Sequence, residues 1–387
     1  MTDTAGEGEA RREAVSRAGR RLRIAYLAHG VHGRQDGVRA KILGQAAMWA
    51  ELDPHVDVGL FVRCEAGADD DWKGQPHVRK VRSSRAGVAG RLLQRELLSL
   101  EVARWRPDLI YLRYSTVSPS IVALAGAIPT VVELNTLDLS ELRMRSQLRY
   151  RWAKATRNLL LRTARGLVVV AGEIASDPAV RRLDVPKVVV PNSIDLARHE
   201  PLSPAHNTAP HLVFIGAPRT PWHGVDKIAQ MARHFPNWTF DLIGPGPEEV
   251  IGHPPNVRVH GLLDSADYHP ILAQADVAIG ALALRRLDLS EASPLKVAEY
   301  LAYGIPAITS YMDTRFPDGA PFLLQLPNTE DNVETSLERI DAFVRNWVGR
   351  RVDREAIACI DARVIERRRL DFMLRSHAAP ARRANSR

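Results

Sequence analysis

The sequence is poor in cysteine and contains no long apolar run. Its two cysteines, Cys64 and Cys359, lie far apart in the chain and match neither a metal-binding spacing nor a redox pair. We therefore expect a cytoplasmic protein without structural disulfides. No apolar segment reaches the roughly 18 residues that a membrane-spanning helix needs. Residues 1–20 carry charges of both signs and lack the apolar core of a secretory signal, so we expect a disordered leader.

Acidic residues are scarce in one segment, which carries most of the net positive charge of the chain. The net charge of +8 at pH 7 allows three kinds of partner: nucleic acid, an anionic membrane surface or anionic small molecules. Between residues 141 and 165, eight basic residues stand against one acid, Glu141, with leucines and Trp152 between them. This pattern predicts a basic, partly amphipathic helix. It is compatible with contact to an acidic membrane face and equally with an ordinary solvated surface.

Short apolar segments alternate with helical periodicity along the chain, which is typical of parallel α/β sheets. A length of 387 residues is long for one core, so we expect two domains. In the first half we predict strands at 22–28, 55–61, 78–81, 109–111, 130–133, 166–170 and 187–190. The helices expected between them are 41–51, 89–105, 119–127 and 140–164.

A second series of strands follows a polar segment rich in proline. We predict these strands at 211–215, 239–243, 257–260, 277–279, 307–309 and 322–326. The expected organisation is a leader (1–20), a first domain (21–196), a linker (197–210), a second domain (211–350), a terminal helix (351–375) and a basic tail (376–387). Since open parallel sheets bind ligands at the carboxyl ends of their strands, we expect two Rossmann-like domains facing each other across a cleft.

The segment 291–306 carries the strongest local signature. Ser293 is a favourable N-cap, Pro294 suits the first helical position, and Gly304 can end the helix in the left-handed conformation. The free N–H groups of residues 294–296 and the helix dipole would then form an anion site. Lys296 adds a positive charge in the first turn, where helix electrostatics alone would disfavour it. A bound anion would account for that choice.

Two carboxylates, Glu291 and Glu299, flank this predicted helix start. Carboxylates accept hydrogen bonds from hydroxyl groups. An anion site between two hydroxyl acceptors fits a sugar nucleotide, with its phosphates in the middle. A surface helix that happens to carry two glutamates is the alternative.

The spacing Glu-x7-Glu, followed by Tyr-Leu-Ala-x-Gly-x-Pro, resembles the donor site of retaining GT-B glycosyltransferases of family four, the glycosyl transferases group 1 type. The resemblance implies that Glu291 contacts the transferred sugar and Glu299 the ribose. It implies that Ser293, Pro294 and Leu295 also border the donor. It further implies that the terminal helix packs back towards the first domain, and that neither a cofactor nor a metal is needed.

The loop after the strand at 211–215 departs from the family pattern. The family has Gly-Arg and then Lys-Gly here, and both cations bind the donor diphosphate. In this chain Ala217 follows Gly216, Arg219 takes the place of the arginine, and His223 stands where lysine is expected. The resemblance implies that Arg219 binds phosphate, because its planar fork suits phosphate oxygens. A surface arginine remains the alternative, and His223 would contribute charge only when protonated.

Further candidates are weaker. Gly246 lies in a strand-end turn, and Leu263 lies in a segment that in the family lines the base pocket. Gly37 ends a glycine-containing loop that the family places near the phosphates. His29, Arg113, Glu133 and Asn135 follow strand ends and are acceptor-side candidates by position; buried structural hydrogen bonding would explain them equally well. We expect the acidic run at 69–71 to be solvated rather than metal-binding.

These patterns predict a metal-independent retaining glycosyltransferase that uses a nucleotide-diphospho-sugar. We expect a hydroxyl acceptor, either free or lipid-linked, in the synthesis of cell-envelope glycan, exopolysaccharide or glycolipid. A sugar-nucleotide hydrolase or epimerase on the same fold is one alternative. A non-catalytic adaptor that binds membrane or nucleic acid through residues 141–165 is another. For the transferase itself we expect no nucleic-acid partner.

Overall fold

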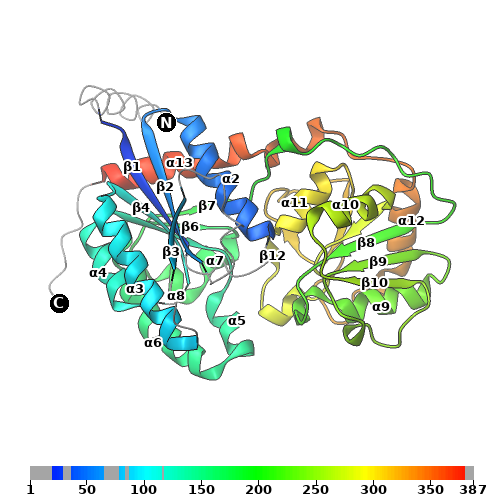
Figure 1. The fold of residues 1–387 in the computed structure, drawn as a ribbon. Coiled ribbons are helices and arrows are strands. Elements are labelled where there is room, and N and C mark those ends of the chain that lie inside the picture. Colours follow the sequence, from blue (N-terminus) through cyan, green and yellow to red (C-terminus); the bar gives the residue numbers. More distant parts are fainter. Residues whose placement is uncertain (1–19, 29–35, 65–77, 83–86, 116, 380–387) are drawn as a thin grey trace. The chain divides into compact units, whose positions relative to one another are not determined.

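The computed structural model describes residues 20–28, 36–64, 78–82, 87–115 and 117–379. Within these residues the chain forms two compact units (Figure 1). Unit 1 contains the residues up to Val169, then 174–190 and those from Glu366 onward. Unit 2 contains 170–173 and 191–365. The predicted leader, His29 and the acidic run at 69–71 lie outside the described residues.

Unit 1 is built on a seven-stranded sheet in which every neighbouring pair is parallel. The strand order is β3-β2-β1-β4-β5-β6-β7, so the order reverses between β1 and β4. The strands are β1 (Leu22–Ala28), β2 (Val56–Cys64), β3 (Val78–Arg82), β4 (Leu109–Arg113), β5 (Thr130–Leu134), β6 (Gly166–Val169) and β7 (Lys187–Val189). The helices of this part of the chain are α2 (Asp36–Leu52), α3 (Gly87–Trp105), α4 (Pro119–Ala127), α5 (Asp138–Arg145), α6 (Gln147–Leu161), α7 (Gly172–Ser176), α8 (Pro178–Arg181) and α13 (Ala362–Ala378).

Unit 2 repeats this arrangement with six parallel strands in the order β10-β9-β8-β11-β13-β15. Its strands are β8 (His211–Ile215), β9 (Thr239–Ile243), β10 (Val257–Gly261), β11 (Val277–Ile279), β13 (Ala307–Thr309) and β15 (Leu323–Gln325), with a small separate pair, β12 (Glu291–Ala292) and β14 (Met312–Asp313). Its α-helices are α9 (Val225–His234), α10 (Ser265–Gln274), α11 (Leu295–Ala302) and α12 (Leu337–Trp347). The 3-10 helices are η2 (Leu196–Arg198), η3 (Pro221–His223), η4 (Pro247–Glu249), η5 (Leu284–Leu287), η6 (Glu334–Ser336) and η7 (Glu355–Ile360).

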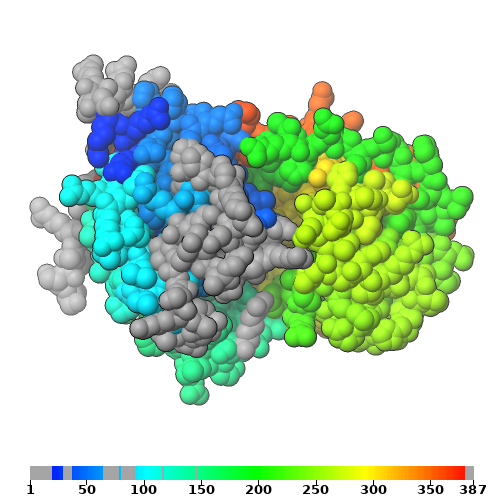
Figure 2. All heavy atoms as spheres, viewed as in Figure 1, coloured from blue at the N-terminus to red at the C-terminus, as the bar shows by residue number. Residues whose placement is uncertain are grey.

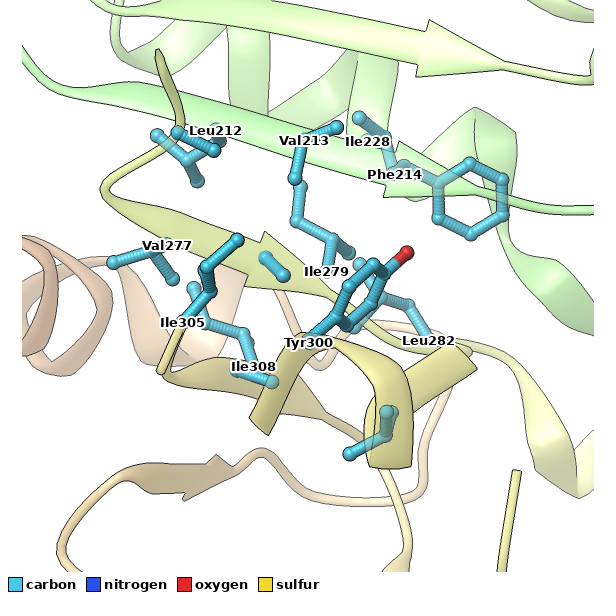
Figure 3. Close-up of a cluster of buried hydrophobic side chains, with 14 of the residues drawn as sticks. Leu212, Val213, Phe214, Ile228, Val277, Ile279, Leu282, Tyr300, Ile305 and Ile308 are labelled. Carbon is cyan, nitrogen blue, oxygen red and sulfur yellow. The ribbon is translucent and has the colours of Figure 1, made fainter. Parts of the chain in front are cut away.

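The core of unit 2 places α11 against the central strands. Strands covered on both faces need continuous apolar runs, and the sequence His-Leu-Val-Phe-Ile of β8 meets this requirement. Side chains of β8, β11 and β13 pack with those of α11 (Figure 3). Tyr300 of α11 is fully buried, and its hydroxyl oxygen accepts a hydrogen bond from the N–H of Ile215 at 2.7 Å. This contact holds α11 at the carboxyl end of β8.

The strand predictions agree closely with the structure, whereas the longest helix predictions do not. Four strands of unit 2, those at 211–215, 239–243, 277–279 and 307–309, have the predicted bounds. The helix predicted at 140–164 is two helices, since Ser146 is extended (φ −165°) and caps α6 by accepting a hydrogen bond from the N–H of Arg149. The predicted terminal helix is also interrupted, because Asp361 (ψ 138°) separates η7 from α13. No helix in the described part of the chain is both long and apolar enough to cross a membrane.

Candidate functional site

Three glycines lie at the carboxyl ends of neighbouring strands of unit 2. The N–H of Gly216 donates to Ile243 O at 2.9 Å, and the N–H of Gly244 donates to Gly261 O at 2.6 Å. Gly244 has φ +104°, and a Cβ there would lie 1.7 Å from Gly216 O. No other residue fits this position, because both the backbone angle and the space exclude a side chain. The backbone of the β8, β9 and β10 ends is therefore packed tightly beside the predicted donor loop.

The surroundings of His223 disfavour its protonated form. It ends η3 in the loop after β8, and its ring centroid lies 5.6 Å from that of Phe214. Burial, with a smaller contribution from the charge of Lys296, lowers the pKa of His223 to about 2. His223 therefore does not supply the positive charge that the family lysine would bring. A Cβ on Gly216 would lie 2.6 Å from its Nδ1, so the glycine makes room for the ring.

Lys296 provides the cation in this region. Its Nζ lies 4.2 Å from the centre of the Phe214 ring, a cation–π contact, and it is buried. Among the residues that the structure describes, the ammonium group has no hydrogen-bond partner. Burial lowers its pKa to about 7. A buried ammonium group with no polar partner is costly, so an anion from outside the protein would stabilise its charged form.

The start of α11 differs from the prediction. The helix begins at Leu295, with Pro294 at the N-cap and no side-chain cap. Ser293 does not cap the helix, because its hydroxyl accepts from the N–H of Asn192 at 2.9 Å and its carbonyl accepts from the side chain of Asn192. The first N–H groups of a helix have no partner within the helix. Since neither Ser293 nor Pro294 caps them with a side chain, the amino end of α11 keeps the character of an anion site.

Glu291 is held in place by a reciprocal arrangement with Glu173. Oε2 of Glu291 accepts a hydrogen bond from the N–H of Glu173 at 3.1 Å. The carboxylate of Glu173 accepts in return from the N–H of Glu291 at 2.8 Å and from the N–H and hydroxyl of Ser290, both at 2.7 Å. A Cβ on Gly172 would approach Oε2 of Glu291 to 3.0 Å. Gly172 and Glu173 therefore fix the orientation of Glu291, the residue predicted to contact the transferred sugar.

Glu299 has one oxygen engaged by the protein. The hydroxyl of Tyr268 on α10 donates to Oε1 of Glu299 at 2.8 Å. Burial raises the pKa of Glu299, and the hydrogen bond from Tyr268 opposes this shift. Tyr303 follows on the same helix, and its ring lies 5.3 Å from that of His199 and 5.1 Å from that of His269. Aromatic and polar groups surround the second carboxylate.

Glu249 links two of the predicted donor residues. Its Oε2 accepts from the N–H of Arg219 at 2.8 Å, and its Oε1 accepts from the N–H of Gly246 at 3.0 Å. Arg219 has φ 55°, a left-handed conformation that is uncommon for a residue other than glycine. Its side chain is exposed. The carboxylate thus holds the loop that carries Arg219 against the turn after β9.

The remaining donor candidates are separate from these contacts. Leu263 is half-buried beside β10 and packs against the core of unit 2, which leaves its predicted place near a base untested. Gly37 is exposed in the first turn of α2, in unit 1. The contacts of unit 2 therefore form four local groups: Gly216 with His223 and Lys296, Glu291 with Glu173, Glu299 with Tyr268, and Arg219 with Gly246.

In unit 1, the acceptor candidate Glu133 is part of a buried charge cluster. Glu133 is fully buried and forms ion pairs with Lys41 (3.0 Å), Arg369 (3.0 Å) and Arg113 (3.4 Å). Burial would raise its pKa, but the three cations outweigh this effect and hold the pKa well below its usual range. Asn135 accepts from Nζ of Lys41 at 2.8 Å. These contacts favour the structural alternative for Glu133 and Asn135 over direct contact with an acceptor.

The terminal helix α13 completes this cluster. Nε of Arg369 donates to Glu366 at 2.8 Å, and its Nη1 donates to the hydroxyl of Tyr111 at 2.8 Å. Glu366 also accepts from Trp49 at 2.9 Å and from Gln45 at 3.2 Å, both on α2. The sheet, α2 and α13 are thus joined by charged and polar contacts inside unit 1.

Several residues of these clusters were not identified from the sequence. Glu173 follows Gly172 directly after a predicted strand, and that position is a signal that could have identified it. Nothing in the sequence marks Tyr268, Glu249, Glu366 or Arg369, because each has a partner that lies far away along the chain. Within the described residues, no group of three or more His, Cys, Asp or Glu side chains is arranged to hold a metal.

Comparison with known proteins gives two family matches. Residues 209–340 match the family model described as Glycosyl transferases group 1. Residues 49–198 match the one described as Glycosyltransferase Family 4. Together the two ranges cover more than half of the chain. No curated protein sequence matches it.

Solved structures share the fold over nearly the whole chain. Sucrose-phosphate synthase from Thermosynechococcus elongatus aligns with a TM-score of 0.64 at 16% identity, covering 93% of this chain and 100% of that one. HepE from Anabaena, solved with UDP and glucose, aligns at 0.59 and 17%, covering 91% and 99%. A Listeria monocytogenes protein described as a UDP-N-acetylglucosamine 2-epimerase aligns at 0.57 and 12%, covering 94% and 98%. These similarities confirm the predicted GT-B type of fold with two Rossmann-like domains.

Proposed function

Because the chain belongs to the glycosyltransferases of group 1 and family 4, we propose that it moves a sugar from a nucleotide-diphospho-sugar to an acceptor hydroxyl with retention of the anomeric configuration. Glycosyl transfer follows from the family. The donor class, the stereochemical course and the residue roles are the proposal. The similar Anabaena protein, solved with UDP and glucose, supports a nucleotide-sugar donor.

One observation carries the donor assignment: the ammonium group of Lys296 is buried beside the amino end of α11 without a protein partner. A diphosphate would supply the missing hydrogen-bond acceptor and meet the free N–H groups of the helix. It would also raise the pKa of Lys296 from about 7 towards its ordinary value, so that the lysine is charged when the donor is bound.

This arrangement suits stabilisation of a leaving group. In the proposed reaction the bond between the anomeric carbon and the diphosphate oxygen breaks. The acceptor oxygen then bonds to the same face of that carbon, and its proton passes to the leaving diphosphate. Charge grows on the diphosphate in the transition state, where Lys296, Arg219 and the α11 amino end would stabilise it. These groups supply positive charge without a metal, and turnover that survives a metal chelator would support this part of the proposal.

Glu291 and Glu299 are assigned different tasks because their surroundings differ. We place Glu291, oriented by Glu173, on the transferred sugar, and Glu299, which keeps one oxygen free of Tyr268, on the ribose. Glu291→Ala and Arg219→Ala should each lower kcat strongly, while Glu299→Ala should mainly raise the KM for the donor. Unchanged kinetics in all three variants would remove these assignments.

A thermal-shift panel with UDP, GDP, ADP and TDP tests the donor class directly. A ligand present at 100 times its Kd adds roughly 2.7 kcal/mol to the free energy of unfolding. We expect one base to raise the melting temperature more than the others, and Lys296→Met to reduce the rise. No response to any of the four nucleotides would contradict the proposal.

A sugar-nucleotide hydrolase or epimerase is the second candidate, since a protein described as an epimerase shares the fold. Donor binding alone does not separate the two activities. Release of free nucleotide without any acceptor, at a rate similar to that with acceptor, would favour the hydrolase. Recovery of an isomerised donor would favour the epimerase.

The acceptor is the least constrained part of the proposal. We propose a hydroxyl acceptor of cell-envelope or glycolipid synthesis, carried on a lipid, and an enzyme that works at the inner face of the membrane. The basic segment at 141–165 supports this placement. Acceptance of a lipid-linked sugar and rejection of free monosaccharides would test it.

A further inference from the structure

Helix α6 carries apolar side chains on two different faces. One face holds Ala153, Leu160 and Leu161, which are buried in unit 1. The other exposes Leu148, Trp152 and Leu159, with exposed fractions of 80%, 54% and 59%. At about 100° per residue, these three side chains fall within roughly 40° of one another around the helix. The exposed row lies on the side of α6 that faces away from the core.

Three exposed arginines, Arg149, Arg151 and Arg162, flank this row. Lys154 is also exposed but lies farther around the helix, beside Tyr150. No acidic residue occurs between Glu141 and Glu173, so the helix has no acidic side chain of its own. Arg157 does not belong to the surface, because it is buried in an ion pair with Asp138 at 2.8 Å. The predicted amphipathic helix thus has an apolar row with cations beside it, directed to solvent. In Figure 2 the segment that contains α5 and α6 reaches the surface of unit 1.

Neighbouring α3 provides an internal comparison. It packs against α4, which in turn packs against α6. Helix α3 also exposes three leucines one turn apart, Leu93, Leu97 and Leu100, at 39%, 36% and 45%. These leucines share their helix with the acids Glu96 and Glu101. Exposed leucines occur on both helices, but only α6 combines larger exposure with charge of one sign.

We propose that the solvent-facing side of α6 binds an anionic bilayer surface. Leu148, Trp152 and Leu159 would enter the boundary between headgroups and acyl chains, and Arg149, Arg151 and Arg162 would contact anionic headgroups. A helix that lies in the membrane interface needs an apolar side that enters the bilayer and basic residues beside that side. This side of α6 is the surface for the membrane contact that is part of the proposed function. It does not depend on the donor site, because binding to lipid needs no nucleotide.

Sedimentation with lipid vesicles tests the inference on the full chain. We expect binding to vesicles that contain phosphatidylglycerol, and little binding to phosphatidylcholine alone. The triple variant Leu148→Gln, Trp152→Gln, Leu159→Gln should weaken binding by about tenfold or more. Each single change of Arg149, Arg151 or Arg162 to Gln should weaken it by about fivefold, with a smaller difference at high salt.

The matched control is Leu93→Gln, Leu97→Gln, Leu100→Gln on α3. It removes the same number of exposed apolar side chains from the same unit, and vesicle binding should stay at the wild-type level. All variants should keep the wild-type melting temperature. Emission from Trp152, obtained as the difference between wild type and Trp152→Phe, should shift to the blue when vesicles are added.

Three results would overturn the inference. The α6 triple variant could bind vesicles as well as the wild type does. Nonspecific electrostatic attraction would then account for the binding, without the apolar row. The protein could bind nucleic acid and not anionic vesicles. Sedimentation velocity could show a dimer that the triple variant loses, which would assign the row to a second copy of the chain. Loss of nucleotide binding in the Lys296 variant, with vesicle binding intact, would separate failure of the donor site from failure of this surface.

Discussion

The two units contain sheets with the same order of their first strands, and both bury charged groups, but one of these groups lacks a protein partner. In unit 1, Glu133 and Arg369 are fully buried and form an ion pair. In unit 2, the buried Lys227 is likewise paired with Glu330, whereas the buried ammonium group of Lys296 has no hydrogen-bond partner among the described residues. Buried charges that are paired hold elements together, while an unpaired buried ammonium group would be stabilised by a ligand. We therefore expect the removal of a paired charge and the removal of Lys296 to affect stability in different directions.

The largest effect is expected when a paired charge of unit 1 is removed. Arg369→Met leaves Glu366 and Glu133 buried with one cation fewer, which should lower the free energy of unfolding by about 3–5 kcal/mol. Urea unfolding followed by circular dichroism measures this loss. Arg345→Met, which breaks the exposed pair with Asp341, is the control and should leave the midpoint nearly unchanged. A wild-type midpoint for Arg369→Met would show that the buried ion pairs of Arg369 do not stabilise unit 1.

The unpaired lysine should behave in the reverse manner. Lys296→Met should leave the stability of the free protein unchanged or raise it, since it removes a buried ammonium group that has no partner. The affinity for the preferred nucleoside diphosphate should fall by about 10- to 100-fold in isothermal titration. Lys227 is the matched control, because it is also buried but is paired with Glu330 at 2.9 Å. Lys227→Met should cost stability and keep the affinity.

The pH dependence of the free energy of unfolding gives a further test of the role assigned to Lys296. In the free folded protein its pKa is lowered to about 7 from an ordinary 10.5. Between these values the unfolded chain binds more protons at this site, so its contribution makes the free energy of unfolding rise with pH. Any stability gained in Lys296→Met should therefore shrink from pH 7 to pH 10.

Nucleotide affinity gives the complementary measurement. Binding requires the charged lysine, so affinity should fall by about tenfold per pH unit above pH 7 in the wild type. The Lys296→Met profile should be flat over the same range. A parallel fall in both proteins would show that another group controls the titration.

The smallest effect is expected at Glu299, whose carboxylate accepts a hydrogen bond at one oxygen from Tyr268. Tyr268→Phe removes one hydrogen bond to Glu299 and leaves the carboxylate in place. If Tyr268 orients Glu299 towards a ribose, the KM for the donor should rise by about two- to tenfold while kcat changes little. Deoxyribose analogues of the donor should be less sensitive to this change. A loss in kcat alone would place Glu299 closer to the reacting carbon.

Local patterns predicted most of the fold, because parallel strands are short and continuously apolar. The breaks at Ser146 and Asp361 were missed, since neither glycine nor proline marks them and helical periodicity continues across both. The strands β12 and β14 have only two residues each, too few for a periodic signal. The helix start near Ser293 was predicted one residue early, because Ser293 binds Asn192 instead of the helix.

The sequence indicated candidate residues for the site but not their electrostatics. The unusual place of Lys296 in a first helical turn was visible in the sequence, whereas its burial beside Phe214 was not. His223 remained open from the sequence, and only its burial shows that it is neutral. Glu133 was selected for its place after a strand, but its three cationic partners come from distant segments, which no local pattern reveals.

The path of the chain has a consequence for biosynthesis. Unit 2 is made of residues up to Ile365, whereas Glu366 and Arg369 of α13 belong to unit 1. On the ribosome, Glu133 emerges 236 residues before the arginine that neutralises it. We therefore expect that unit 2 can fold before α13 completes unit 1. A chain truncated after Ile365 should show a protease-resistant unit 2 and a protease-sensitive unit 1.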